Sequence, residues 1–366
     1  MFPHVYVHVP FCARRCTYCD FAIAVRPEVP VREYLDALAG EIRMAGNAAA
    51  ARTVYLGGGT PSQLGGEGIA DLARLLDVPR ELDEFTIEAN PDDVTSGAAR
   101  AWRQAGVTRV SVGVQSFQPN VLAWMHRTHT AEAAEAAIRT LRDAGMPSIS
   151  LDLIFALPRS LERDLAADLA RAVALGPDHV SLYGLTIEPA TPLGRQAAHG
   201  ELTPATDARY EDEYLLAHER LGAAGYRFYE VSNAARPGHE AVHNAAYWSG
   251  APYLGLGPSA HSFDGTDRWW NAPAYTTWLK RLAAGESPVA GRETPDAKAR
   301  ELERLYLGLR TARGVHLSHD QADKLAAVRR WQAQGWAQLA EDESRTVTVT
   351  LTRAGWLRLD ELVASL

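Results

Sequence analysis

Short apolar and β-branched runs alternate with amphipathic helical segments through the first half of this 366-residue chain. The runs begin at His4, Thr53, Glu84, Arg109, Ser148 and His179, and the helical patterns cover 33–45, 69–77, 133–145 and 161–176. Strands and helices that alternate at roughly thirty-residue intervals indicate right-handed βαβ units and a parallel sheet. Six units are fewer than the eight that close a full barrel, so the pattern favours an open doubly wound α/β sheet or a partial barrel.

The pattern changes after about residue 200. A helix is predicted over 207–225 and a strand over 227–233, followed by a stretch rich in Gly, Pro, His and aromatics that we expect to be an irregular connecting region. The last part of the chain is predicted to contain helices at 296–310 and 318–334, two strands and a closing helix. This order is typical of a winged-helix-like α+β domain. The predicted barrel, connecting region and winged-helix-like domain cover 1–235, 236–290 and 291–366.

Charge and hydropathy narrow the functional classes. The net charge is −8, and 296–366 holds 11 Lys or Arg against 10 Asp or Glu, which argues against a nucleic-acid-binding surface. No segment offers the eighteen or so uncharged apolar residues that span a bilayer, and the N-terminal MFPHVYVHVPF lacks the features of a signal peptide. We therefore expect a cytoplasmic protein; peripheral contact with the inner membrane and homodimer formation stay open.

The three cysteines of the chain lie within eight positions, with the spacing C-x3-C-x2-C at Cys12, Cys16 and Cys19. Buried structural thiols would be scattered over the core. A zinc site needs a fourth ligand, for which His4 or His8 would have to reach back from the preceding strand. A redox pair would leave Cys12 without a role. Three thiolates on one loop can bind three irons of a cubane cluster and leave the fourth iron open, which is the reading we favour.

The segment YVHVPFCARRCTYCDF, residues 6–21, resembles the cluster loop of the radical S-adenosylmethionine (SAM) enzymes. It is most similar to the branch that contains oxygen-independent coproporphyrinogen III oxidase and the HemW haem chaperones, and the similarity covers nearly the whole chain. This resemblance implies a partial (β/α)6 TIM-like barrel, a [4Fe–4S] cluster on the three cysteines, and SAM on the open iron. In the family's chemistry, a reduced cluster passes one electron to SAM and releases a 5′-deoxyadenosyl radical.

Polar or glycine-rich residues follow five consecutive predicted strands. After the second strand, the glycines of LGGGTPS allow the backbone to approach a ligand, and their bare N–H groups could bind a carboxylate. Glu88 and Asp152 could instead cap helices or stabilise turns. The resemblance implies that Tyr6 and Tyr18 flank the cluster, that Gly58, Gly59 and Thr60 meet the methionyl amino group, and that Glu88, Gln115, Arg127, Asp152 and Thr186 line the nucleoside and carboxylate.

Two departures separate this chain from the oxidases that it resembles. Those enzymes have a fourth cysteine where this chain has Phe21, and a longer extension before the first strand. The segment HNAAYW, which begins at His243, resembles the HNxxYW motif of the HemW family, whose histidine is associated with haem ligation. A neutral imidazole beside flat aromatic rings suits haem iron, although a loop histidine bonded to backbone is the alternative. His239 and His261 are further candidates, and the oxidase comparison places His261 facing the cofactor cavity.

The resemblance therefore implies a haem chaperone that binds haem, a [4Fe–4S] cluster and SAM, and that passes haem to an acceptor such as a respiratory haem protein. The alternative is a radical enzyme that oxidatively decarboxylates the propionates of coproporphyrinogen III. A third interpretation is another tetrapyrrole-modifying radical enzyme, for example one that opens the haem ring. Whether SAM is cleaved in the protein's function stays open.

Overall fold

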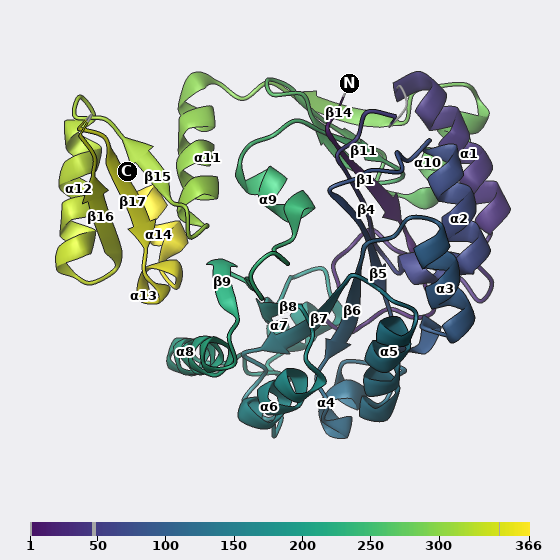
Figure 1. Cartoon of the computed structure of the whole chain (residues 1–366), viewed down its shortest axis with the longest axis horizontal. Coiled ribbons are helices and arrows are strands. Elements are labelled where there is room, and N and C mark those ends of the chain that lie inside the picture. Colours follow the sequence, from purple (N-terminus) through teal and green to yellow (C-terminus); the bar gives the residue numbers. More distant parts are fainter. Residues whose placement is uncertain (1, 46–48, 344) are drawn as a thin grey trace.

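A single twelve-stranded sheet organises the chain from His4 to Glu293 (Figure 1). The computed structural model describes residues 2–45, 49–343 and 345–366. Six adjacent parallel strands form the partial barrel: β1 (His4–Val9), β4 (Thr53–Gly58), β5 (Glu84–Ala89), β6 (Arg109–Gln115), β7 (Ser148–Phe155) and β8 (His179–Gly184). The predicted partial barrel is confirmed, and each of the six strands begins at the predicted residue.

Side chains in the barrel strands alternate between an apolar outer set and a polar inner set. In β1, for example, Val5, Val7 and Val9 are fully buried in the hydrophobic core. The alternate positions of the strands line an internal cavity, and they include Tyr55, Glu88, Arg109, Ser111, Gly113, Gln115, Asp152, Ser181 and Tyr183. Because successive residues of a strand point to opposite faces, this alternation gives the barrel an apolar outside and a polar inside. A full TIM barrel is filled by bulky branched residues, whereas this interior can accept a polar ligand.

Helices cover the outer face of the sheet (Figure 1). They are α1 (Val31–Ala45), α2 (Gly65–Leu75), α3 (Ser96–Gln104), α5 (Ala131–Asp143), α6 (Leu165–Leu175) and α8 (Asp207–Ala223), with the short α4 (Pro119–Trp124) and α7 (Pro192–Ala198) in the loops. Side-chain oxygens of Thr95, Thr130, Asp164 and Thr206 cap α3, α5, α6 and α8. Among the described residues, none of the helices has the length and apolarity needed to cross a membrane.

The segment 236–290 is not irregular, which corrects the prediction. It contains or adjoins β10 (Asn233–Ala235), α9 (Val242–Trp248), β11 (Tyr253–Leu256), β12 (His261–Phe263), β13 (Arg268–Asn271), α10 (Tyr275–Ala283) and β14 (Val289–Glu293). Strand β11 pairs in parallel with β1, so that His4 lies opposite Tyr253, and β12 to β14 extend that edge. These strands have only three to five residues each, too few to show a two-residue period in the sequence.

The C-terminal part of the chain forms a smaller α+β unit. Its elements are α11 (Ala297–Leu309), β15 (Val315–Leu317), α12 (Ala322–Ala333), β16 (Ala337–Glu341), β17 (Val347–Leu351), α13 (Arg353–Trp356) and α14 (Leu359–Ala364). The strands form an antiparallel sheet in the order β15-β17-β16. The predicted helices and strand pair are present, β15 was missed, and the closing helix is divided in two. The similarity of this unit to a winged helix stays a prediction.

Arg310 joins the C-terminal unit to the open edge of the barrel. Its guanidinium lies 3.0 Å from the carboxylate of Glu230, which is fully buried at the end of β9 (Arg227–Glu230), and 4.2 Å from the ring centroid of Trp248 in α9. The carbonyl of Arg310 also accepts a hydrogen bond from the N–H of Val231 at 3.0 Å. One side chain therefore contacts the last strand of the sheet, the HNAAYW helix and the C-terminal unit together.

Candidate functional site

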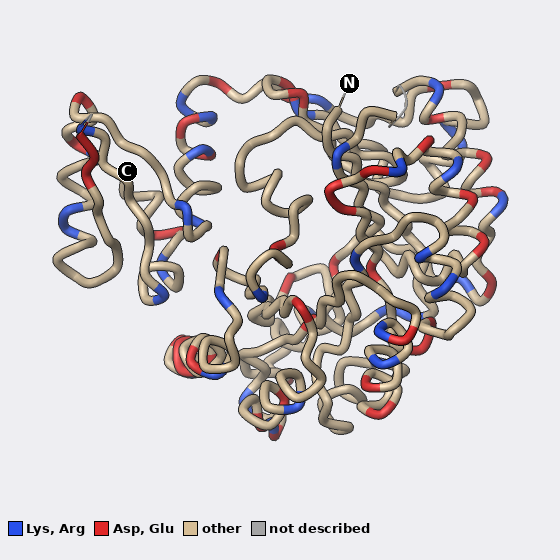
Figure 2. The backbone as a smooth tube through the Cα atoms, viewed as in Figure 1, with Lys and Arg blue, Asp and Glu red and all other residues tan. Residues whose placement is uncertain are grey.

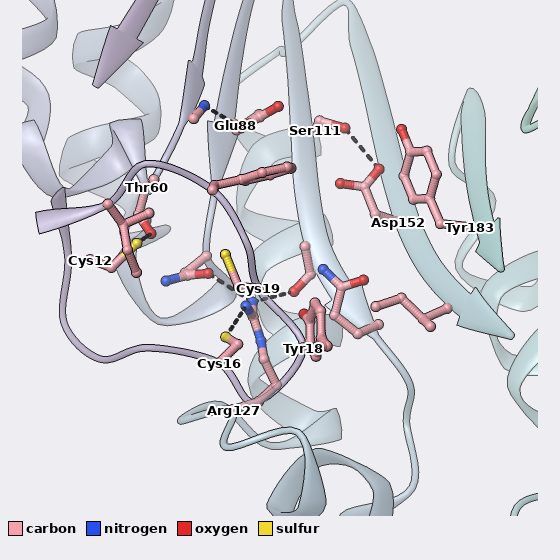
Figure 3. A pocket seen from close by; sticks show the side chains of 18 of the residues that line it. Cys12, Cys16, Tyr18, Cys19, Thr60, Glu88, Ser111, Arg127, Asp152 and Tyr183 are labelled. Carbon is pink, nitrogen blue, oxygen red and sulfur yellow. Dashed lines mark hydrogen bonds between the residues drawn. The ribbon is translucent and has the colours of Figure 1, made fainter. Parts of the chain in front are cut away.

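A cavity of about 400 Å³ lies inside the partial barrel, at the carboxyl ends of its strands (Figure 3). The loop that follows β1 forms one side of it. All the residues that the resemblance assigns to SAM or to the cluster, except Tyr6, line this cavity: Cys12, Cys16, Tyr18, Cys19, Gly58, Gly59, Thr60, Glu88, Gln115, Arg127, Asp152 and Thr186. The structure thus brings together residues that are spread over more than 170 positions of the sequence.

The cysteine loop is fixed at both of its ends. Cys12 belongs to β2 (Phe11–Cys12), which pairs with β3 (Ala24–Val25), and the N–H of Ala24 donates to the carbonyl of Pro10 at 2.7 Å. The loop between these strands carries Cys16 and Cys19. All three thiols are partly exposed, are not in disulfides, and face the cavity. The fold therefore holds three free thiols at the rim of one site.

Two polar side chains contact the thiols. The hydroxyl of Thr60 lies 3.4 Å from Cys12 Sγ, and Arg127 Nη1 donates to Cys16 Sγ at 3.7 Å (Figure 3). Burial raises the pKa of Cys12 to about 11, and the hydrogen bond from Thr60 opposes this effect. Burial also raises the pKa of the Cys19 thiol. A cation such as Arg127 favours thiolates nearby, and thiolates are the form that binds metal.

The donor set suits a group with several metal atoms. Among the described residues, no three His, Cys, Asp or Glu side chains converge on one point in the way that a single metal ion requires. The three thiols nevertheless line one cavity. Such spacing fits a cluster in which each cysteine binds a different iron atom.

The glycine-rich turn differs from the expectation in one respect. The N–H of Gly58 donates to Glu88 Oε2 at 3.1 Å, and the N–H of Gly59 donates to the carbonyl of Val9 at 2.8 Å. These N–H groups are therefore not bare. A Cβ on Gly59 would lie 2.6 Å from the backbone of Pro10, so glycine is required here for close contact with the cysteine loop. An amino group of a ligand would meet carbonyl or hydroxyl oxygens at this turn.

Glu88 and Asp152 lie inside strands and neither caps a helix, so that alternative was wrong. Glu88 Oε1 accepts from the hydroxyl of Tyr55 at 2.8 Å, and Asp152 accepts from Ser111 Oγ at 2.9 Å. Burial raises the pKa of Glu88 to about 7, against the hydrogen bond from Tyr55, and burial likewise raises the pKa of Asp152. Both carboxyls face the cavity, where they can accept hydrogen bonds from a ligand (Figure 3).

Gln115 is held in an unusual backbone conformation, and the side chain of Arg127 is fixed by hydrogen bonds. Gln115 has φ +67°, an uncommon value for a residue with a Cβ, and it lies at a bulge between β6 and β7. Arg127 Nη2 donates to Asn90 Oδ1 and to the carbonyl of Gly113, both at 2.7 Å. Strained backbone that is fixed by surrounding bonds is common where a side chain must be aimed at a ligand.

Tyr6 and His243 do not line the cavity. Tyr6 stacks on Tyr55 behind the cavity wall, and its hydroxyl lies 3.1 Å from His8 Nδ1. His243 has no exposed surface, and its Nδ1 lies 2.7 Å from Thr53 Oγ1 while its Nε2 lies 2.9 Å from the hydroxyl of Tyr247. Burial lowers the pKa of His243 to about 3. In this conformation neither nitrogen of His243 is available to a haem iron.

Two further histidines and Phe21 lie outside the cavity or at its rim. His261 is exposed on β12 and stacks on Trp270, so its expected place facing the cavity was wrong. His239 lies outside the cavity wall, with Nδ1 3.4 Å from Ser148 Oγ. Phe21 is 59% exposed at the cavity rim, and packing in the core therefore does not explain it.

Sequence reasoning missed several residues of the cavity wall. These are Tyr55, Asn90, Arg109, Ser111, Ser181, Tyr183 and Asn244. Most of them occupy the alternate, polar positions of strands that were correctly predicted. The two-residue period of RVSVGVQ and HVSLYG could have shown that these polar side chains share the inner face of the sheet.

Comparison with known proteins gives consistent results. The Radical SAM superfamily matches residues 6–172. The heme chaperone HemW of Mycobacterium tuberculosis is 39% identical over 99% of this chain and 94% of its own length, and that of Bacillus subtilis is 34% identical over 85% and 84%. The structure of coproporphyrinogen III oxidase (HemN) from Escherichia coli, a radical SAM enzyme, superposes with a TM-score of 0.82 over 100% of this chain and 90% of that one. Its sequence identity is 22%, so this similarity concerns the fold.

Proposed function

We propose a haem-delivering function for this chain, which belongs to the HemW family of the radical SAM superfamily. It binds haem, a [4Fe–4S] cluster and SAM in the cytoplasm, and it passes haem to an acceptor haem protein, with a respiratory complex as the expected acceptor. The observation that carries this proposal is the 39% identity with a heme chaperone over 99% of the chain. The complete set of polar residues around one cavity supports it.

The cluster would be held by Cys12, Cys16 and Cys19. When bound, it would supply one-electron chemistry and one iron without a protein ligand. The protein's own residues prepare the site for it. Arg127 places a positive charge beside the thiolates, and Thr60 donates to Cys12, so both reduce the energetic cost of assembling anionic sulfur at a partly buried place.

SAM would occupy the cavity beside the cysteine loop. Glu88 and Asp152 offer carboxylate acceptors, and Gln115 offers an amide, all from neighbouring strands. Calorimetric titration with SAM tests this site, because Glu88→Ala and Asp152→Ala should each weaken binding while the protein stays folded. Glu219→Ala, on the exposed face of α8, is the matched control. Unchanged SAM affinity in both cavity variants would contradict the assignment.

Coproporphyrinogen oxidase activity is the second candidate function, and the match to the fold of that enzyme favours it. The phenylalanine at Phe21, in place of the fourth cysteine that the oxidases carry, argues against it. Anaerobic incubation with coproporphyrinogen III, a reductant and SAM separates the two functions. We expect no protoporphyrinogen; its formation with multiple turnovers would overturn the chaperone proposal.

His243 remains the candidate haem ligand, but it requires a conformation other than the one described. Helix α9 would have to move, because both ring nitrogens of His243 are engaged beneath it. A haem titration of His243→Ala should then give a weaker Soret band than the wild type. His199→Ala, at an exposed histidine outside the cavity, is the matched control. Equal Soret bands in the wild type and His243→Ala would remove His243 from the haem site.

Outside the cavity, basic and acidic residues lie near one another along most of the chain, although helix α8 is mainly acidic. Figure 2 shows basic and acidic residues interleaved along the outer helices and the C-terminal unit. A protein acceptor would therefore be recognised by local contacts, and the C-terminal unit beside the barrel opening is our proposed docking face. Anaerobic reconstitution followed by iron counting, with absorption spectra before and after haem addition, tests whether cluster and haem bind together.

A further inference from the structure

Arg109 is a buried cation in the cavity wall that the proposed cofactor site does not use. It begins β6, lines the cavity and is only 3% exposed. Its Nη2 lies 3.3 Å from His179 Nδ1. Its other two nitrogens, Nε and Nη1, have no hydrogen-bond partner among the residues that the structure describes. Burial of a guanidinium with unmet donors is unfavourable unless something else completes its bonding.

The acidic side chains near Arg109 are committed to other donors. Glu84 accepts from the N–H groups of Val242 at 2.7 Å and His243 at 3.3 Å, so it holds the N-terminus of α9. Asp152 accepts from Ser111, and Glu88 accepts from Tyr55 and Gly58. These carboxylates attract Arg109 through space, but among the described residues none accepts a hydrogen bond from its Nε or Nη1. The cation therefore lacks a direct anionic partner.

Arg109 lies away from the end of the barrel where the cysteine loop is found. It precedes Gln115 by six residues of one strand, which corresponds to roughly 20 Å between their Cα atoms. The carboxylate of a SAM molecule bound at the cysteine loop is thus not its natural partner. Nε and Nη1 of Arg109 are instead available to donate to an acidic group of a second ligand.

Two neighbours in the cavity wall suggest what carries that anionic group. Tyr183, on β8, is 44% exposed while it lines the cavity, so a face of its ring is open to a ligand. Asn244, in the HNAAYW helix α9, lines the same cavity and offers amide donors. An open aromatic face, an amide and an unpaired guanidinium together match a flat apolar ligand with a carboxylate at its edge.

We propose that Arg109 binds a propionate carboxylate of the tetrapyrrole, whose ring lies against Tyr183 and whose edge meets Asn244. This inference rests on the proposed haem function and adds to it a recognition site for the carboxylate. It also places the tetrapyrrole edge next to α9, the helix that would have to move to expose His243. Arg109, and not the histidine motif alone, then selects ligands that carry acid groups.

The test compares haem with haem dimethyl ester, which has the same ring and iron but no carboxylate. Both are titrated into the reconstituted full-length protein under anaerobic conditions in the same detergent, with wild type, Arg109→Lys, Arg109→Met and the surface control Arg139→Met. We expect the wild type and Arg139→Met to prefer haem by at least about tenfold, Arg109→Lys to keep part of that preference, and Arg109→Met to lose it. Iron content and SAM affinity should be equal in all four proteins.

Thermal stability gives a second readout. Haem should raise the melting temperature of Arg109→Met by less than it raises that of the wild type, because the variant lacks the carboxylate contact. A merely structural role for Arg109 would change the ligand-free melting temperature but leave the haem-induced shift and the preference for haem equal to those of the wild type, which would overturn the inference.

The remaining outcomes are also decisive. Equal affinity of the wild type for haem and its dimethyl ester overturns the carboxylate site but leaves the haem function standing, and this comparison needs no variant to fold. Failure of both porphyrins to bind overturns the haem function and this inference together. Competition with 10 mM inorganic phosphate is the last test. If phosphate abolishes the preference for haem over its dimethyl ester equally in the wild type and in Arg139→Met while haem still binds, the site is a general anion site. Its assignment to the tetrapyrrole is then wrong.

Discussion

Glu88 shows how the cavity makes a single carboxyl sensitive to pH. Its pKa is raised by burial to about 7, above the ordinary value of 4.5, so between these values the native state holds a proton that the unfolded chain has released. Stability contributed by the protonated carboxyl is present at pH 4.5 and is lost as the pH rises through 7. A buried, partly ionised acid is common at sites that bind ligands, where a partner compensates the charge.

Replacement of Glu88 with glutamine should therefore have a pH-dependent effect on stability. At pH 5 the variant Glu88→Gln resembles the protonated native carboxyl, and little change is expected. At pH 8 it should be more stable than the wild type by about 2 to 3 kcal/mol, because no buried charge is left. Urea unfolding of the cluster-free protein at the two pH values measures this difference. An equal change at both values, or a similar pattern in the surface variant Glu219→Gln, would contradict it.

The thiol of Cys12 should make cluster assembly depend on pH. Its pKa is raised to about 11, and the metal binds the thiolate, so anaerobic cluster assembly should accelerate as the pH rises from 7 to 9. Thr60→Val removes the hydrogen bond that favours the thiolate and should slow assembly at each pH. Absorbance at the charge-transfer band of the cluster follows the reaction. The exposed variant Thr266→Val serves as control, and identical rates in the two variants would show that Thr60 has no such role.

The sequence indicates individual site residues only where spacing or position is distinctive. The three cysteines share an unusual spacing, and Glu88 and Asp152 lie in recognisable strands. Arg109 was not predicted as a site residue, because arginines are numerous in this chain and only the two-residue period of RVSVGVQ, which puts Arg109 on the inner face of the sheet, sets it apart. The orientation of His243 was also beyond prediction, because its two partners, Thr53 and Tyr247, are brought to it by the tertiary fold.

At the scale of elements, α9 is a short helix held by polar contacts. Its seven residues are too few to be stable alone, and Glu84 supplies the acceptor at its N-terminus. Thr53 on β4 lies between His243 Nδ1 at 2.7 Å and His4 Nδ1 at 2.8 Å. One hydroxyl thus connects α9 to two strands of the barrel.

Thr53→Val should loosen α9 while it preserves the shape of the side chain. Two buried imidazole nitrogens lose a partner, and we expect a loss of about 1 to 3 kcal/mol in unfolding free energy. Amide exchange in α9 should accelerate, and, if His243 binds haem, haem affinity should rise as the helix is released. The surface variant Thr277→Val on α10 is the control. Unchanged exchange in α9 would contradict the role given to Thr53.

Long elements were easier to predict than short ones. The six barrel strands carry enough alternating residues to be recognised, and their starting residues agree with the structure. Strands β11 to β14 have three to five residues, and the pairing of β11 with β1 depends on contacts across more than 200 positions of sequence. Such pairing is decided by the tertiary fold and leaves no periodic signal.

At the scale of the whole molecule, the buried contact between Arg310 and Glu230 links the barrel and the C-terminal unit. Glu230 also accepts from Asn233 Nδ2 at 2.6 Å and from the N–H of Ser232. Trp248, the last residue of HNAAYW, packs against the same guanidinium. Movement of the C-terminal unit and movement of α9 are therefore expected to be coupled.

Arg310→Met should weaken this contact strongly. It leaves the buried carboxylate of Glu230 without its cation, which typically costs about 3 to 5 kcal/mol, and the double variant with Glu230→Gln should recover part of that loss. Limited proteolysis of the connector 294–296 and thermal unfolding report the effect. Arg304→Met, which breaks an ion pair on the surface of α11, is the control and should cost less than about 1 kcal/mol. Strictly additive single and double variants would refute the coupling.

The parallel pairing of β1 with β11 also affects biosynthesis. His4 is among the first residues made, whereas Tyr253 leaves the ribosome roughly 250 residues later, a delay of roughly 12 to 50 s at typical rates of bacterial or eukaryotic translation. During this interval the strand that leads into the three cysteines has one edge unprotected. The cysteine loop, which is still partly exposed in the finished fold, therefore has a time window for metallation on the nascent polypeptide before its supporting strand is fixed on both sides.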